Sequence, residues 1–170
     1  MNNSPNKLKA VFISALVMTL LSITPILSLI NLFCCAGVII GGFAGAYFYN
    51  NDLKKVNGFI EYKDGVMIGI LSGIVTAVIY TGVLLLYQLY SETNLFIEMT
   101  TELEKLGVQL SPEFYKGMDY FNDEINQYGF SPTLTIVSLF IYMIIYPLFG
   151  AIGGLLAVSL FKRRQPTQTL

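Results

Sequence analysis

Long uncharged blocks, separated by short charged ones, are the feature that most constrains how this 170-residue chain can fold. Only 12% of its residues are charged, whereas a soluble domain carries about 25%. A water-soluble protein distributes charge along every surface helix, so this segregation indicates a lipid bilayer. Four blocks have enough residues to cross about 30 Å of hydrocarbon at about 1.5 Å per residue: 10–29, 32–49, 66–90 and 134–161.

A membrane-spanning segment must satisfy its backbone hydrogen bonds internally, so each block is a helix unless the chain forms a closed barrel. The strict apolar/polar alternation of barrel strands is absent from the sequence. We therefore expect an all-α integral membrane protein with four transmembrane helices in a single domain, residues 1–170. No Ala-x-Ala-like cleavage site follows the first apolar run, so we expect this run to be an uncleaved anchor.

Basic and acidic residues concentrate on opposite sides of this four-helix arrangement. The N-terminus, the loop after the second span and the C-terminus together hold eight basic and three acidic residues, a net charge of +5. Segment 91–131 holds two basic and eight acidic residues, a net charge of −6. Cytoplasmic loops retain Lys and Arg because their translocation is disfavoured. We expect a multi-pass protein of the bacterial inner (plasma) membrane, with both termini cytoplasmic and segment 91–131 outside.

Small residues recur at helical spacing in three of the four blocks. Helix association in a bilayer gains little from the hydrophobic effect, so residues that allow close backbone approach decide the packing. We expect a tightly packed bundle of the glycine-zipper kind. The alternative is that the same glycines form a homo-oligomer interface or line a pore. The residues expected in helix packing are Gly37, Gly41, Gly45, Gly65, Gly69, Gly73, Gly150 and Gly154.

Side chains suited to catalysis or metal binding are scarce. The chain has no His and only two cysteines, Cys34 and Cys35, whereas a metal site needs three or four ligands. We interpret the cysteines as packing residues beside a turn, with an intermolecular disulfide as the alternative. The spans contain no Ser-His pair and no zinc motif, and no acidic or basic residue lies deep within them. We therefore expect no catalytic residues, no cofactor, no metal and no nucleic-acid partner, and the protein is not expected to be an enzyme.

Hydroxyl groups are the main polar groups near the middle of the spans. Hydrogen bonding between helices is the favoured interpretation, because Ser, Thr and Tyr commonly serve that purpose in membrane bundles. A polar path for a small neutral solute is the alternative. The residues concerned are Thr76, Tyr80, Tyr142 and Tyr146.

Segment 91–131 is too long for a simple connection, and two amphipathic helices fit it. We expect Gly107 to end the first helix, and Ser111 and Pro112 to cap and begin the second, which stops before Gly129. An apolar face laid over the bundle or the interface is favoured, and a docking surface for a partner protein is the alternative. The apolar faces are formed by Leu95, Met99, Leu103 and Leu106 in the first helix and by Phe114, Met118, Phe121, Ile125 and Tyr128 in the second.

Three stretches, INLFCCAGVIIGGFAGAYFY, IEYKDGVMIGILSGIV and PLFGAIGGLLAVSLFKRR, carry a resemblance to uncharacterised bacterial four-helix membrane families of the domain-of-unknown-function type. The resemblance covers about Ser28 to Arg164 and implies fold and membrane location only. From the residues we expect a non-enzymatic structural or accessory subunit of a membrane assembly. Its partners would be the lipid bilayer and another membrane protein or a second copy of this chain. The alternative is an oligomeric channel or facilitator for a small neutral solute.

Overall fold

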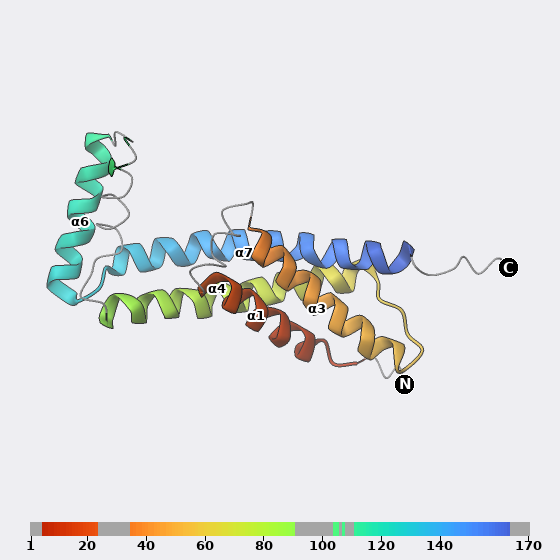
Figure 1. Cartoon of the computed structure of the whole chain (residues 1–170). Helices are drawn as coiled ribbons and strands as arrows, with labels where there is room; N and C mark the ends of the chain where they lie inside the picture. The colour runs from red at the N-terminus through yellow and green to blue at the C-terminus, as the bar shows by residue number, and fades with distance from the viewer. Residues whose placement is uncertain (1–4, 24–34, 91–103, 106, 108–110, 164–170) are drawn as a thin grey trace. The chain divides into compact units, whose positions relative to one another are not determined.

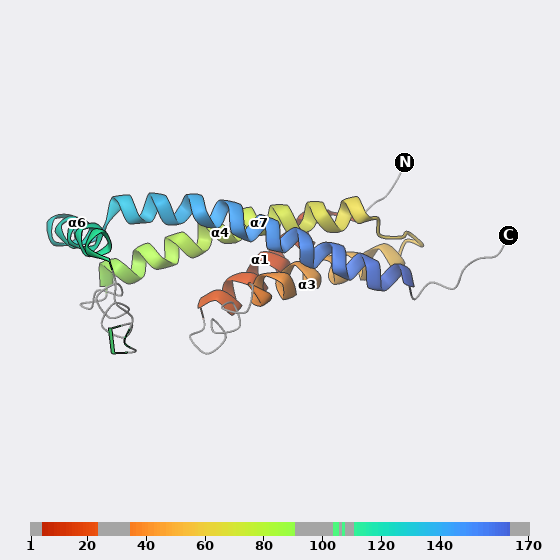
Figure 2. The same ribbon diagram turned by 90° about the horizontal axis from the view of Figure 1, so that it is seen from above.

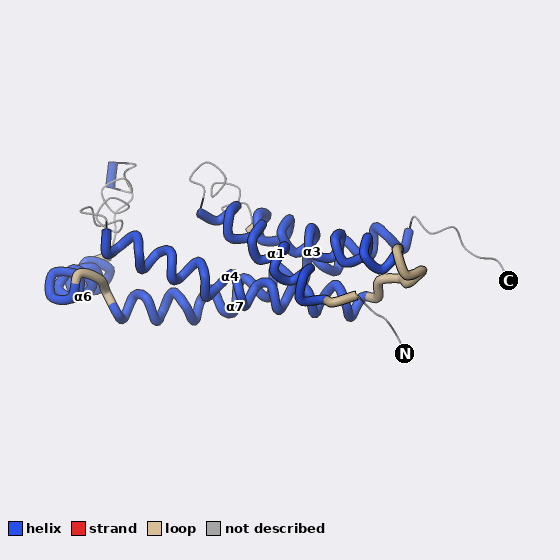
Figure 3. Tube along the Cα trace, turned by 90° about the horizontal axis from the view of Figure 1, so that it is seen from below, coloured by secondary structure: helices blue, strands red, loops and turns tan. Residues whose placement is uncertain are grey.

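A computed structural model describes residues 5–23, 35–90, 104–105, 107 and 111–163 of the chain. Within these ranges every long regular element is an α-helix and no strand occurs, as Figure 3 shows. The expected all-α class is therefore confirmed. The helices are α1 (Lys7–Ile23), α3 (Ala36–Lys54), α4 (Tyr62–Tyr90), α6 (Pro112–Tyr128) and α7 (Pro132–Arg163) (Figure 1).

Two of the described helices, α4 and α7, are long and apolar enough to cross a membrane. They contain 29 and 32 residues, whereas a span needs about 20. Helix α1 has 17 residues, and α3 ends in the polar sequence NNDLK, so neither meets the same criterion. Of the four expected spans, two therefore correspond to described helices that could cross a membrane. Residues 24–29 of the first expected span and 32–34 of the second lie outside the described ranges.

The chain divides into two compact units, which are described separately. The four-helix unit comprises Met1–Tyr80 and Ile141–Leu170, and the corner unit comprises Thr81–Phe140. Helices α4 and α7 contribute residues to both. The four-helix unit holds α1, α3 and the adjoining parts of α4 and α7, and the two views in Figures 1 and 2 show α1 and α3 beside each other.

Charged side chains gather at one end of the four-helix unit. Lys7 at the start of α1 pairs with Asp64 at the start of α4, with 2.6 Å between Nζ and Oδ1. Lys9 pairs with Asp52 at the end of α3, and Lys162 near the end of α7 lies 4.3 Å from the ring centroid of Tyr62. Helices that follow one another in this unit therefore run in opposite directions. We call this region the charged end; it includes Lys7, Lys9, Asp52, Lys55, Asp64 and Lys162.

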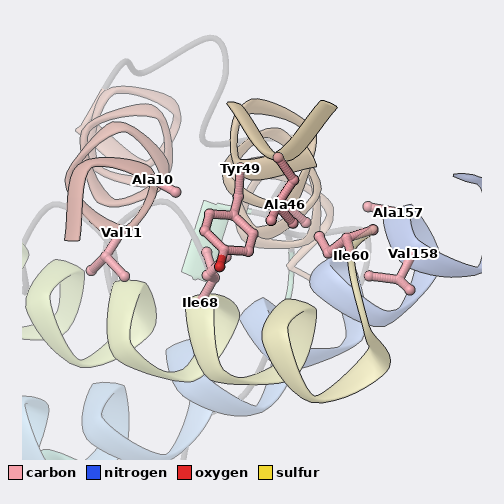
Figure 4. Close-up of a cluster of buried hydrophobic side chains, with 9 residues drawn as sticks. Ala10, Val11, Ala46, Tyr49, Ile60, Ile68, Ala157 and Val158 are labelled. Carbon is pink, nitrogen blue, oxygen red and sulfur yellow. The ribbon is translucent and has the colours of Figure 1, made fainter. Parts of the chain in front are cut away.

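Small and hydroxyl-bearing residues fill much of the interior of the four-helix unit. Ser14, Ser72 and Thr76 are fully buried. A buried apolar cluster joins all four helices and the loop before α4 (Figure 4, where all members but Leu53 are labelled). Its members are Ala10, Val11, Ala46, Tyr49, Leu53, Ile60, Ile68, Ala157 and Val158. A second cluster contains Met18, Val38, Ala77 and Tyr146.

Large apolar side chains cover the outside of the same unit. Leu16 on α1 is 61% exposed and Ile144 on α7 is 68% exposed. In a water-soluble bundle the large apolar residues lie inside and the polar residues outside. Here many large apolar residues lie on the outside, and they occur on all four helices: Phe12, Leu16, Leu20, Ile40, Phe48, Ile70, Leu71, Ile144, Leu148 and Leu156.

The second helix expected in segment 91–131 is confirmed as α6, in the corner unit. Ser111 caps its N-terminus, where the Ser111 hydroxyl accepts a hydrogen bond from the Phe114 backbone N–H. Gly129 ends it in the left-handed conformation, with φ 79°. Met118 is buried on the expected apolar face, whereas Phe114 and Tyr128 are exposed. The first expected helix of this segment, with Leu95, Met99, Leu103 and Leu106, falls almost entirely outside the described residues.

Glu124 of α6 caps the start of α7. Its carboxylate accepts hydrogen bonds from the Ser131 hydroxyl and from the backbone N–H and hydroxyl of Thr133. The Ser131 hydroxyl in turn accepts from the Leu134 N–H, 3.1 Å away, so α7 begins at the expected Ser-Pro step. The hydrogen bonds from Ser131 and Thr133 hold the pKa of Glu124 below its ordinary value of 4.5.

Glu124→Gln should remove an acid-dependent step in the stability of the start of α7, within the corner unit. A carboxyl group whose pKa is lowered by folding stabilises the fold above its unfolded pKa, and this contribution is lost as the pH falls through the folded pKa. We expect protection of the Thr133 and Leu134 amides against hydrogen exchange, corrected for intrinsic rates, to fall below about pH 4.5 in the native chain. The same step should be absent from E124Q and retained in D123N, which changes an exposed neighbour. Equal acid dependence in native protein and E124Q would rule out this role.

Candidate functional site

The closest helix contacts in the four-helix unit join α4 to α7 backbone to backbone. A Cβ atom placed on Gly69 would fall within 3.0 Å of the Gly150 carbonyl group, and one placed on Gly150 would lie 2.5 Å from the Gly69 oxygen. Gly65 and Gly154 face each other in the same way. Such distances leave no room for any side chain, so glycine is required at these crossing points.

Helix α3 approaches both α1 and α7 through glycines. Gly41 and Gly45 lie against Met18 and Ser14 of α1, and the Ser14 hydroxyl donates a 2.8 Å hydrogen bond to the Gly41 carbonyl oxygen. On another face of α3, Gly42 lies against the Gly150 backbone. The remaining expected positions are buried Gly37 in α3, and Gly73 in α4, which lies against the backbone at Pro147 and Tyr146.

Two glycines in these contacts, Gly42 and Gly153, were missed by the sequence analysis. A Cβ on Gly153 would meet the Ile39 carbonyl group of α3. Both glycines stand one residue away from the expected four-residue stripes, at Gly41-Gly42 and Gly153-Gly154. Paired glycines give a helix two adjacent small faces, so each of these helices can approach two neighbours. The pairs were visible in the sequence as the signal for this arrangement.

The expected hydroxyl residues come together where α4 and α7 face each other within the four-helix unit. Tyr142 and Tyr146 stack at 5.3 Å between ring centroids, and Tyr80 meets both rings edge-on, at 5.1 and 5.8 Å. Tyr146 makes a hydrogen bond with Ser22 of α1. Thr76 is fully buried, and its hydroxyl donates to the Ala15 carbonyl oxygen, 3.3 Å away. We call Tyr80, Tyr142 and Tyr146 the tyrosine cluster.

Apolar side chains surround the tyrosine cluster, which packs with Met18, Val38 and Ala77. Edge-to-face and stacked rings at these separations attract each other, and each pair contributes about 0.5–1.5 kcal/mol beyond the area it buries. The hydroxyls also tie α4 and α7 to α1 through Thr76 and Tyr146. These contacts pack α1, α4 and α7 against one another.

Of the two cysteines, only Cys35 belongs to the part of the chain that the structure describes. Cys34 lies outside the described residues. Cys35 is a half-buried residue that precedes α3, and its backbone has φ 54°, in the left-handed region. It packs against the apolar cluster that contains Met18 and Tyr146. Among the described residues, no group of three or more Cys, Asp or Glu side chains is placed to hold a metal ion.

Ion pairs join residues of α1, α3 and α4 at the charged end. The hydrogen bond to Asp64 raises the pKa of Lys7, and Asp64 also accepts from the Glu61 backbone N–H at the start of α4. Asp52 receives a 2.5 Å bond from Lys55 and lies 3.7 Å from Lys9. The Lys55 hydrogen bond lowers the pKa of Asp52. Both Asp52 partners are mostly exposed, so these pairs contribute little to stability.

A groove of about 540 Å³ opens between α1 and the end of α3, beside Asp52. Its walls combine apolar side chains with charged ones. The lining residues are Lys9, Ala10, Ile13, Phe48, Asn51, Asp52 and Lys55. The sequence analysis placed these lysines on the expected cytoplasmic side, but a groove depends on how two helices meet, and no motif in the sequence marks it.

No protein-family model, curated protein or solved structure matches the chain. The resemblance to bacterial four-helix membrane families therefore stays a prediction.

Proposed function

We propose that this chain is a four-span protein of the bacterial plasma membrane that serves as a structural or accessory subunit of a larger membrane assembly. One observation carries the proposal: in the four-helix unit small and hydroxyl-bearing residues form the closest helix contacts, and many large apolar residues lie on the outside. In a bilayer, lipid tails cover the apolar exterior, and close packing of small residues holds the helices together. In water, an exposed apolar surface of this extent would promote aggregation.

The charged end supports an orientation with both termini in the cytoplasm. The first residues of α1 and the last residues of α7 lie at this end, together with the loop between α3 and α4. It is rich in lysine, and Lys and Arg are retained on the cytoplasmic side of bacterial membranes. On this view α6 lies outside the membrane.

The structural role is supported by what the polar and small residues do. The backbones of α4 and α7 meet at four glycines: Gly65, Gly69, Gly150 and Gly154. The hydroxyls of Ser14 and Thr76 donate hydrogen bonds to carbonyl groups of neighbouring helices. These are packing functions. A protein built in this way can hold a fixed apolar surface against another membrane protein, while the exposed acids of α6 face the outer medium.

Extraction of the full-length protein in a mild detergent, followed by mass analysis of the intact complex, tests this role. We expect a foreign membrane protein to copurify in a fixed ratio. A homo-oligomer without a foreign partner would contradict the accessory role and favour a channel or facilitator. Recovery in the soluble fraction, without detergent, would contradict the membrane location itself.

The tyrosine cluster gives the means to test the channel alternative. We expect Tyr146→Phe to weaken the bundle by about 1 kcal/mol, because the hydrogen bond with Ser22 is lost while the ring stays packed. Thermal unfolding in detergent measures this loss. Glycerol flux into liposomes should be the same for the native protein and Y146F. A flux carried by the native protein and abolished in a folded Y146F would show instead that the hydroxyl lines a path.

A further inference from the structure

We infer that the groove between α1 and α3 binds one anionic phospholipid, with the phosphate between Lys9 and Lys55 and an acyl chain along α1. The inference rests on the proposed membrane location. Its ligand class is a diacyl phospholipid with a single phosphodiester charge, of the phosphatidylglycerol type. The site is distinct from the glycine contacts and from the tyrosine cluster, which lie in the interior of the four-helix unit.

Charge is the first argument for this ligand. Two lysines and one aspartate line the groove, so its formal charge is +1, which one phosphodiester neutralises. Asp52 lies 2.5 Å from the Lys55 ammonium group and 3.7 Å from that of Lys9, so both ammonium groups lie beside the same part of the groove. Each ammonium group has three donors and Asp52 uses only some of them, which leaves donors for phosphate oxygens. Asn51, a polar residue, lines the groove beside them.

Shape and position are the second argument. The groove measures about 540 Å³, within the range of about 300–1,000 Å³ that small-molecule sites occupy. Ala10, Ile13 and Phe48 form its apolar walls. Away from the lysines, α1 continues with the exposed side chains of Phe12, Leu16 and Leu20. A molecule lying here meets charge at one end and apolar surface along its length, as a phospholipid at the cytoplasmic membrane surface requires.

The exposure of the two lysines makes the site testable without disturbing the fold. The side chains of Lys9 and Lys55 are 69% and 72% exposed, so glutamine at both positions should leave the bundle intact. Lys54 and Lys63 provide a matched control, since both are exposed near the same end and neither lines the groove. K9Q/K55Q and K54Q/K63Q remove the same charge. Asp52→Asn tests the opposite change, because it raises the formal charge of the groove to +2.

The experiment is native mass spectrometry of the full-length, membrane-extracted protein titrated with phosphatidylglycerol. We expect K9Q/K55Q to bind the lipid roughly 10- to 30-fold more weakly and K54Q/K63Q to change less than about threefold, since each nearby lysine is worth about a tenfold factor or less. D52N should bind more tightly than the native protein. An equal loss in both lysine pairs would show attraction to the whole charged end and overturn the site.

Parallel titrations distinguish a lipid phosphate from free inorganic phosphate, and membrane fractionation tests the proposed function separately. Phosphatidylcholine should bind more weakly than phosphatidylglycerol, and excess inorganic phosphate should not displace the lipid. Displacement by inorganic phosphate would identify a free-anion site and overturn the lipid assignment. A chain that does not fractionate with membranes refutes the proposed function, whereas membrane-extracted protein without selective binding refutes this inference alone.

Discussion

Gly69→Ala is expected to destabilise the four-helix unit by about 1–3 kcal/mol, because the added methyl group would clash with the α7 backbone. The added methyl group would fall within 3.0 Å of the backbone of Gly150 and of Ala151 in α7. Backbone atoms cannot rotate away as a side-chain tip can, so α4 and α7 must move apart. Their separation also strains the Gly42 contact, because Gly42 of α3 lies against the same residue, Gly150.

Gly82 provides a matched control in the same helix. A Cβ on Gly82 meets nothing within 4 Å, so Gly82→Ala adds the same methyl group without a clash. Alanine favours a helix over glycine by up to about 1 kcal/mol, so G82A should be neutral or stabilising. Reversible unfolding of both variants in mixed detergent micelles gives the comparison. Equal stabilities for G69A and G82A would contradict close packing at Gly69.

Met18→Ala is expected to cost at least about 2 kcal/mol, through loss of packing at the point where all four helices of the unit meet. Met18 is fully buried, lies against Gly41 and approaches Gly150, and its sulfur is 3.5 Å from the Thr76 hydroxyl. In a bilayer the hydrophobic transfer term is small because lipid is also apolar, so the loss comes from contacts around the cavity. The expected cost therefore lies near the lower end of the range for buried methionines.

Leu16→Ala is the matched control for Met18, two residues away on α1. Leu16 is largely exposed, and in the proposed membrane location lipid would cover it. We expect its truncation to change the unfolding free energy by less than about 0.5 kcal/mol. A cost for L16A equal to that for M18A would place Leu16 against protein and contradict the proposed exterior.

Local signals allowed the ends of α6 and α7 to be predicted from the sequence. Ser111-Pro112 and Ser131-Pro132 begin these helices because a serine side chain caps free N–H groups and proline needs no hydrogen bond at the first position. Gly129 ends α6 because glycine adopts positive φ without strain. These features depend on a few adjacent residues, so neighbouring helices could not override them.

Contacts between helices were harder to predict, because they depend on how one helix is turned against another. The recurrence of Gly65, Gly69 and Gly73 shows that α4 has a small face, but it does not say that Gly150 lies opposite Gly69. The roles of Gly42 and Gly153 required that pairing to be known. In the same way, Lys7 and Asp64 pair because α1 and α4 begin at one end of the unit, and the groove beside Asp52 exists only where α1 meets α3.

The central claim is that the helices cross a membrane with the charged end in the cytoplasm. Two fusions to a reporter that is active only in the cytosol test it most directly. In the first, the reporter follows Leu170. In the second, it replaces all residues after Gly129. We predict activity for the fusion at Leu170 and silence for the fusion after Gly129. Activity at both positions would show that α4 and α7 do not cross the membrane, and a silent fusion at Leu170 would reverse the proposed orientation.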